Sequence, residues 1–110
     1  MRAPHPVLLA LASAALTAAP APLLAAGKTY VVTMKAMAFG PVPAGLRVGD
    51  TIEWVNDDVV RHTATAANKS FDVDLQPKAR GRTLLTAAGV FPFVCRFHPG
   101  MKGVLRVARQ

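Results

Sequence analysis

After residue 26 the sequence consists of short β-prone runs separated by turn residues, with no helical periodicity long enough to specify a helix. The runs recur about every 8 to 12 residues, with Gly, Pro, Asn or Asp between them. The runs expected to form strands are residues 29–34, 46–48, 51–55, 61–66, 71–75, 82–86, 90–95 and 103–107. The pattern predicts an all-β chain folded as a sandwich of two antiparallel sheets.

The first 26 residues have the composition of a secretory signal peptide. Arg2 precedes an apolar run over residues 7–19, and small residues and prolines follow. That run is shorter than the roughly 20 residues that a spanning helix needs. We therefore predict a signal peptide over residues 1–26, cleaved near Ala25 or Ala26, and a periplasmic protein. A retained anchor is the alternative, which the alanines and prolines of the segment disfavour.

Removal of the signal peptide would leave residues 27–110, enough for one domain with a modest core. Of the 13 Lys and Arg only Arg2 lies in the signal, so 12 basic and 6 acidic residues give this segment a net charge of +6. The cations are scattered rather than gathered on a helix, and nucleic-acid binding is not expected. An acidic protein partner or a membrane surface suits such a chain better, without stable insertion into the membrane.

One short segment concentrates groups that bind soft metal ions. Cys95, His98 and Met101 lie in C-R-F-H-P-G-M between two expected strands, and His62 lies upstream in R-H-T-A-T-A. Taken singly, each has an ordinary structural explanation, such as a buried thiol or a methionine that fills the core. Together they supply a thiolate, two imidazoles and a thioether, the ligand set of blue-copper sites. The sequence therefore predicts one bound copper ion.

The cysteine count agrees with a metal-bound thiol. Cys95 is the only cysteine, so it cannot form an internal disulfide. In an oxidising compartment a free thiol is open to oxidation unless it is buried or bound to a metal.

The run G-V-F-P-F-V-C-R-F-H-P-G-M-K-G-V-L-R-V resembles the C-terminal copper loop of the cupredoxins, and its short spacing is similar to that of amicyanin. The upstream runs M-K-A-M-A-F-G-P and V-G-D-T-I-E-W-V-N also resemble the amicyanin and plastocyanin pattern. The resemblance implies a monomeric Greek-key β-sandwich over residues 27–110 with one type 1 copper ion. His62, Cys95 and His98 would then form a trigonal plane around the ion, with Met101 as the axial ligand.

The resemblance also implies single-electron transport between a redox donor and an acceptor, with the exposed edge of His98 as the electron port. A small apolar patch near that edge, rimmed by cations, would suit brief docking with an acidic partner. The residues expected to form this patch are Met37, Phe39, Phe97, Pro99 and Gly100.

Two positions depart from the family pattern. Many members have Asn after the first copper His, where its side chain ties the two ligand loops together, and this chain has Thr63. We expect a looser tie from the shorter hydroxyl. Amicyanin and plastocyanin usually have Pro before the second His, and this chain has Phe97. Phe97 supplies an amide N–H that Pro lacks, and this N–H could point at the Cys95 sulfur.

Other functions remain open on the sequence alone. Copper storage, delivery or tolerance is the main alternative, because binding copper does not by itself establish electron transfer. Proteins of that kind often use Met-rich or His-rich open segments, and this chain has none beyond the one loop. Zinc would accept the thiolate and the imidazoles, but Met is an unusual ligand for it. A copper oxidase or nitrite reductase would need more histidines, so we do not expect an enzyme. An adhesive or structural sandwich would bind no metal.

Overall fold

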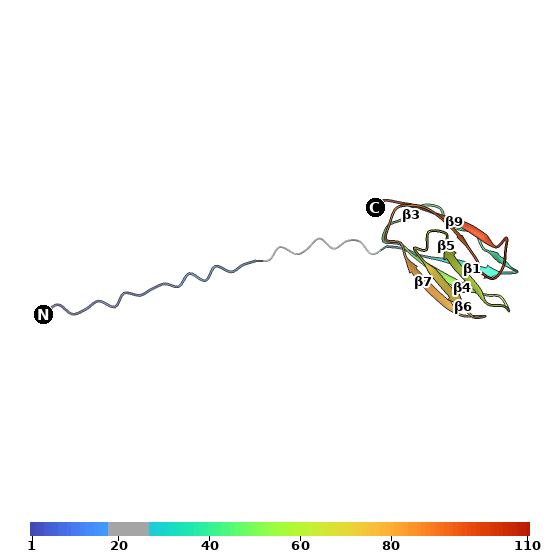
Figure 1. The fold of residues 1–110 in the computed structure, drawn as a ribbon. Helices are drawn as coiled ribbons and strands as arrows, with labels where there is room; N and C mark the ends of the chain where they lie inside the picture. The colour runs from blue at the N-terminus through green and yellow to red at the C-terminus, as the bar shows by residue number, and fades with distance from the viewer. Residues whose placement is uncertain (18–26) are drawn as a thin grey trace.

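The computed structural model describes residues 1–17 and 27–110. The predicted cleavage near Ala25 or Ala26 lies outside the described residues. Residues 1–17 are exposed and contain neither helix nor strand, and nowhere in the described ranges is there a helix long and apolar enough to cross a membrane. All strands and all buried residues of the described chain lie within residues 27–110, so this segment contains the whole sandwich (Figure 1).

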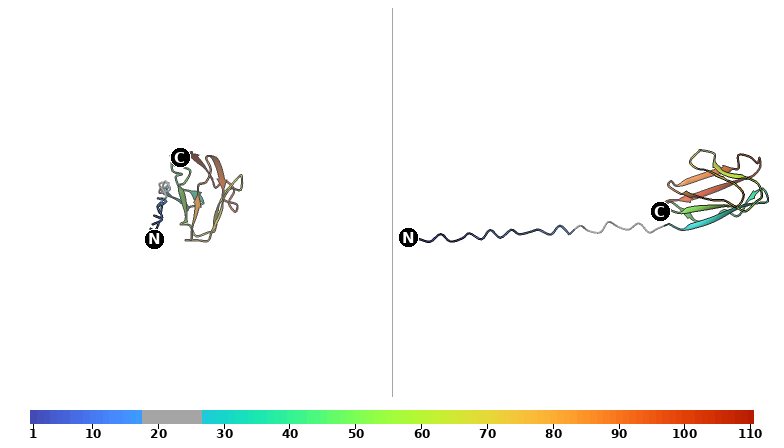
Figure 2. Two further views of the ribbon diagram at one scale, coloured as in Figure 1. Left: turned by 90° about the vertical axis from the view of Figure 1, so that its left-hand side faces the viewer. Right: turned by 90° about the horizontal axis from the view of Figure 1, so that it is seen from below.

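Nine strands in the described chain form two sheets that pack face to face (Figure 1, Figure 2). The first sheet has the order β2-β1-β4-β7 and the second has the order β3-β9-β8-β5-β6. The bounds are β1 Thr29–Lys35, β2 Ala38–Phe39, β3 Leu46–Arg47, β4 Thr51–Asn56, β5 His62–Ala66, β6 Asp72–Leu75, β7 Arg80–Leu84, β8 Gly89–Val94 and β9 Lys102–Ala108. The predicted all-β sandwich is confirmed.

The prediction that both sheets are antiparallel is wrong, because each sheet contains one parallel pair. β1 runs parallel to β4, and β3 runs parallel to β9. After β2 the chain crosses to the second sheet as β3 and then returns to the first sheet as β4. Parallel neighbours require a crossover of this kind, whereas a hairpin joins antiparallel ones. The short β2 was also not predicted, since two residues are too few to show a period.

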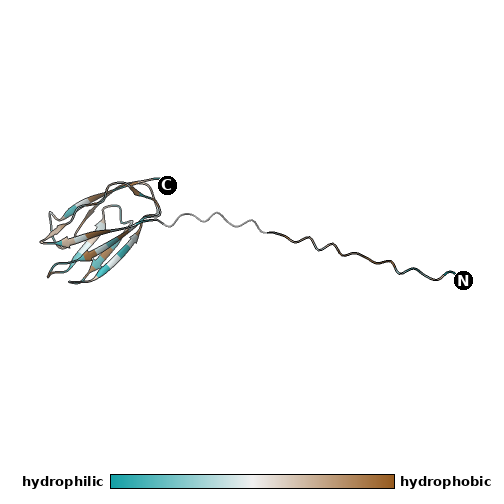
Figure 3. Ribbon diagram, turned by 180° about the vertical axis from the view of Figure 1, so that it is seen from behind, coloured by the Kyte–Doolittle hydropathy of each residue, from teal (hydrophilic) through white to brown (hydrophobic). Residues whose placement is uncertain are grey.

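The centre of the sandwich is a group of aromatic rings. Successive residues of a strand face opposite sides, and buried residues alternate with more exposed ones along β1, β4 and β9. Hydrophilic and hydrophobic residues are accordingly mixed along the ribbon (Figure 3). Phe93 meets Phe39 and Trp54 edge to face, with ring centroids 4.7 and 5.2 Å away. The Trp54 Nε1 donates a hydrogen bond to Thr83 Oγ1 at 3.0 Å, so the indole is buried without an unpaired donor. Gly103 makes room for Phe93, because a Cβ at this position would lie 2.4 Å from the Phe93 Cζ.

The register of the second sheet brings the predicted metal ligands to one end of the molecule. β5 and β8 are antiparallel, with Thr65 opposite Val94. The start of β5, at His62, therefore lies beside the chain that leaves β8 at Cys95. β9 begins directly after Met101 and closes the loop.

Candidate metal centre

The structure brings His62, Cys95 and His98 together, with their donor atoms within 4.8 Å of one another. The Cys95 Sγ lies 3.8 Å from the Nδ1 of His62 and 3.3 Å from the Nδ1 of His98, and the two Nδ1 atoms are 3.1 Å apart. Bonds of about 2.0 to 2.3 Å from one ion to three coplanar donors would separate those donors by roughly 3.5 Å. The three side chains fit a single ion.

Met101, the fourth predicted ligand, is buried at the same end of the sandwich. Its carbonyl accepts a hydrogen bond from the Cys95 amide at 3.0 Å, and its amide donates to the His98 carbonyl at 3.1 Å. Gly100 has φ 90, a conformation that favours glycine, at the turn between His98 and Met101. The loop is thus closed by its own backbone. The role of Met101 as axial ligand stays a prediction.

Thr63 ties the two ligand-bearing segments together. Its amide donates to the Cys95 Sγ at 3.3 Å, and its hydroxyl accepts from the Arg96 amide at 2.9 Å. The Nε of Arg96 also donates to the Thr65 hydroxyl at 3.3 Å. A hydrogen bond of 2.9 Å has ordinary length, so the two segments are joined by the Thr63 hydroxyl. That this tie is looser than the one an Asn would make stays a prediction.

The environment of Cys95 favours the thiolate that metal binding requires. Burial opposes ionisation, but the amides of Thr63 and Phe97 and the rings of both histidines hydrogen-bond to the sulfur and lower the pKa of Cys95 to about 6. The measured amide–sulfur distance is that of Thr63, 3.3 Å, and the expectation that the Phe97 N–H points at the sulfur stays a prediction.

Asp58 is a functional residue that sequence reasoning missed. Its Oδ2 lies 2.8 Å from the Nε2 of His62 and accepts a hydrogen bond from the Met37 amide at 3.1 Å. The Val59 amide donates to its Oδ1 at 2.8 Å. The bond to His62, with these two amides, lowers the pKa of Asp58 to about 2. A carboxylate at Nε2 holds the proton there and leaves Nδ1 free for a metal ion.

The hydrogen bond between Asp58 and His62 also affects the pKa of His62. Burial opposes the charged ring, but the bonds to Asp58 and to Cys95 outweigh it and raise the pKa of His62. In the sequence, the only sign of this contact is that Asp58 precedes His62 by four residues. Such a spacing is too common to indicate a contact by itself.

The turn that carries Asp58 is built by the buried side chain of Asn56. The Nδ2 of Asn56 donates to the carbonyls of Val60 and Leu75 at 2.9 and 3.0 Å, and its Oδ1 accepts from the Asp58 amide at 3.0 Å. Asn56, the last residue of the run V-G-D-T-I-E-W-V-N, thus fixes the turn whose carboxylate holds His62.

The segments that hold the donors also expose apolar side chains. Met37 and Phe97 are 47% and 42% exposed, as the sequence analysis expected of a patch near His98. Phe39 does not belong to this surface, because it packs into the aromatic core. Val59 and Val60, 81% and 37% exposed, join the apolar surface instead. The sequence analysis assigned these two residues no role.

Phe97 lies between two arginines. The guanidinium carbons of Arg61 and Arg96 are 4.7 and 5.4 Å from its ring centroid. Both arginines form ion pairs with Asp74, and Arg96 also pairs with Asp72. The side chains beside His98 are therefore held in place by neighbours on β6.

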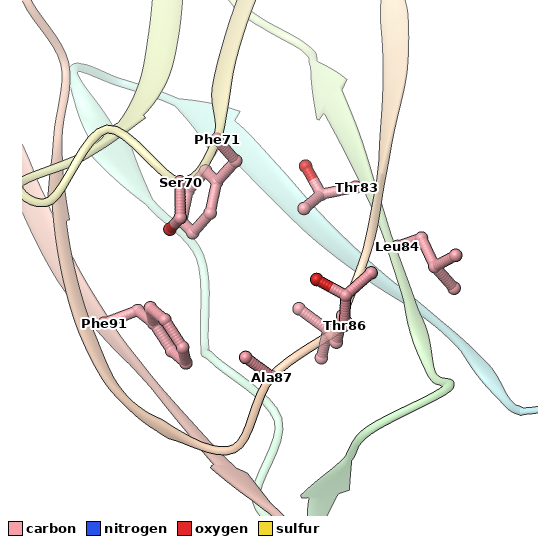
Figure 4. A pocket seen from close by; sticks show the side chains of 8 residues that line it. Ser70, Phe71, Thr83, Leu84, Thr86, Ala87 and Phe91 are labelled. Atoms are coloured by element: carbon pink, nitrogen blue, oxygen red, sulfur yellow. The ribbon is translucent and has the colours of Figure 1, made fainter.

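A small pocket of about 50 Å³ lies elsewhere, between the end of β7 and β8 (Figure 4). It contains none of the predicted ligands and no ionisable group. The lining residues are Ser70, Phe71, Thr83, Leu84, Leu85, Thr86, Ala87 and Phe91.

Comparison with solved structures gives the fold independently. A point mutant of amicyanin in its Cu(I) form has a TM-score of 0.65 and 22% identity, over 73% of this chain and 82% of that one. A purple cupredoxin from Nitrosopumilus maritimus has a TM-score of 0.58 and 24% identity, over 71% of this chain and 98% of that one.

A copper-containing nitrite reductase from Thermus scotoductus has a TM-score of 0.59 and 29% identity. That match covers 76% of this chain but only 23% of the reductase. A search of the curated proteins finds no match.

A family model described as a cupredoxin-like domain matches residues 7–107. The matched range contains both histidines, the cysteine and the methionine of the predicted ligand set. With this fold, His62, Cys95 and His98 are positioned as a copper-binding site. The chain belongs to the cupredoxin-like domain family.

Proposed function

We propose that this protein is an exported type 1 copper protein that shuttles single electrons between redox partners. His62, Cys95 and His98 would hold the ion, with Met101 as a fourth ligand. The observation that carries the proposal is the cluster of one thiol and two imidazoles that fits a single ion. Copper bound there would supply a one-electron couple between Cu(II) and Cu(I).

The surroundings of the cluster suit such a couple because they limit movement. Cys95 follows a paired strand, His62 begins another, and the Thr63 hydroxyl joins the two segments. Asp58 fixes the ring of His62 on the side away from the other donors. A donor set that hardly moves needs little reorganisation when an electron arrives or leaves.

The surface beside His98 suits short-lived contact with another protein. Met37, Val59 and Phe97 are exposed, whereas His98 is half-buried. The net charge of residues 27–110 is positive, so we expect an acidic donor and acceptor whose association weakens as salt is added. We further propose a periplasmic location and a monomeric carrier that is not itself an enzyme.

Visible absorption spectroscopy tests the proposal. The segment 27–110 is titrated with Cu(II), reduced with ascorbate and reoxidised in air. We expect an intense blue band that bleaches and returns, and no such band in Cys95→Ser. Copper binding without the band would indicate storage or delivery instead, and failure to bind copper would contradict both.

A further inference from the structure

One half of the outer surface of the second sheet carries cations and aliphatic side chains and no carboxylate. Leu105 and Val107 of β9 are buried, so the alternate residues of β9 face outward, as do their neighbours on β8 and β3. We name this surface the β9 face. Its residues are Arg47, Val90, Pro92, Val94, Lys102, Val104, Arg106 and Ala108.

The cations of the β9 face form no ion pairs in the part of the chain that the structure describes. None of the ion pairs within the described residues involves Arg47, Lys102 or Arg106. The β5–β6 edge of the same sheet differs, because Asp72 and Asp74 pair there with arginines. The remaining carboxylates are also engaged: Glu53 and Asp57 with cations, Asp58 with His62, and the buried Asp50 with the backbone amides of Lys28 and Arg47.

The aliphatic side chains lie between the cations. Pro92 is opposite Val104 at the middle of the β8–β9 pair. Toward one end Val94 is opposite Lys102, and toward the other Val90 is opposite Arg106. Val90, Val94 and Val104 are 56%, 43% and 36% exposed. None of the residues that make up the β9 face is a neutral hydrogen-bonding side chain.

The spacing of the cations favours an extended anionic surface over a small anion as the occupant. Lys102 and Arg106 are four residues apart on one strand, which places them about 13 Å apart. With their backbones this far apart and Arg47 on a third strand, the three cations are spread over the face, which favours an extended anionic surface over a single phosphate or carboxylate. A specific protein interface would also need matched polar groups, roughly one hydrogen bond per 100 to 200 Å². A bilayer with anionic headgroups needs no matched positions.

We propose that the β9 face docks this protein reversibly on a membrane surface rich in anionic phospholipid. The cations would lie among the headgroups, and the valines would contact the bilayer at the level of the interface. This docking is independent of copper, so it holds for the apoprotein as well. The cluster of metal donors lies at the end of the sandwich, beyond the start of β9, and stays open to a redox partner.

Vesicle sedimentation of residues 27–110 tests the proposal. The probes are vesicles of phosphatidylcholine alone and of phosphatidylcholine mixed with phosphatidylglycerol, at low and high salt. The test variant is Lys102→Gln with Arg106→Gln. The matched control is Arg80→Gln with Arg82→Gln, which removes the same charge from β7, where both arginines pair with Glu53.

We expect binding to the mixed vesicles only, and loss of that binding at high salt. At roughly fivefold per cation, the test variant should bind about 25-fold more weakly. The control variant should bind nearly as well as the wild type. Circular dichroism checks that both variants keep the β fold.

Three outcomes would overturn the proposal. Equal weakening in both variants would mean that net charge alone attracts the protein. Equal binding to both kinds of vesicle would mean that the charge plays no part. No binding to the mixed vesicles would exclude a bilayer, and retention on immobilised polyglutamate would then point to an acidic protein as the occupant.

Discussion

Asp58 changes what can be expected of the copper ligand His62. Its carboxylate accepts a hydrogen bond from the Nε2 of the His62 ring, which is fully buried. Two backbone amides hold that carboxylate in place. Its neighbour Asp57 is chemically identical but pairs with Lys35 and Lys78 on the surface. The two acids therefore offer a natural comparison between a carboxylate that supports the site and one that does not.

We predict that Asp58→Asn raises the reduction potential and weakens copper binding by about tenfold or more. A negative charge beside the ligand stabilises Cu(II) more than Cu(I), so its removal favours the reduced ion. Redox titration gives the potential, and competition with a chelator gives the affinity. Asp57→Asn should leave both quantities near the wild-type values. Equal effects in the two variants would contradict a specific role for Asp58.

In the apoprotein, the pKa of the Cys95 thiol should lie far below its ordinary value. The pKa of Cys95 falls from 9.0 to about 6 on folding, so the thiolate stabilises the folded chain fully above pH 9.0. That contribution decreases as the pH falls and is lost below about 6. We expect the ultraviolet absorbance of the thiolate to appear with a midpoint near pH 6 in the folded apoprotein and near 9.0 in urea. The same midpoint in both states would refute the shift.

At the scale of elements, the loop from β8 to β9 combines a chemical role with a packing role at one residue. The Phe97 amide helps to lower the pKa of Cys95, while its ring lies between Arg61 and Arg96. The amide affects the pKa of the sulfur, and the ring packs against the arginines at the surface. Different substitutions of Phe97 can remove one effect and keep the other.

We predict that Phe97→Pro lowers the reduction potential, because the lost N–H leaves more electron density on the Cys95 sulfur. Phe97→Ala is the matched control, since it removes the ring but keeps the amide. Voltammetry of both variants should show a lower potential for the proline variant than for the alanine variant. Equal potentials in the two would mean that the amide has no influence on the copper.

For the whole molecule, the contact between the two sheets depends on a close approach at Gly103. Phe93 fills the space over this glycine and meets Trp54 of the opposite sheet. Any side chain at this position would push the ring away from the core.

We predict that Gly103→Ala lowers the free energy of unfolding by about 1 to 3 kcal/mol, the usual cost of overpacking. Val104→Ala, a change at an exposed neighbour on the same strand, should have a much smaller effect. Urea unfolding of residues 27–110, followed by fluorescence, measures both. A loss for Gly103→Ala no larger than that for Val104→Ala would show that the ring can move at little cost.

The sequence by itself determined the all-β class, the positions of most strands and the chemistry of the site. These depend on local information, namely the period of side chains along a strand and the donor types of Cys95, His98 and Met101. Local patterns also have limits. The strand expected at residues 82–86 is β7, Arg80–Leu84, because its start is set by pairing with β4 and not by its own exposed arginines.

Only the tertiary structure decided which distant residues meet. The parallel pairs arise from a crossover between sheets, the carboxylate of Asp58 reaches His62 through a turn shaped by Asn56, and the hydroxyl of Thr63 spans to Arg96. The β9 face likewise joins β3 to β8 and β9, which lie far from it in the chain. Such contacts depend on register and on packing between sheets, and a one-dimensional pattern carries neither.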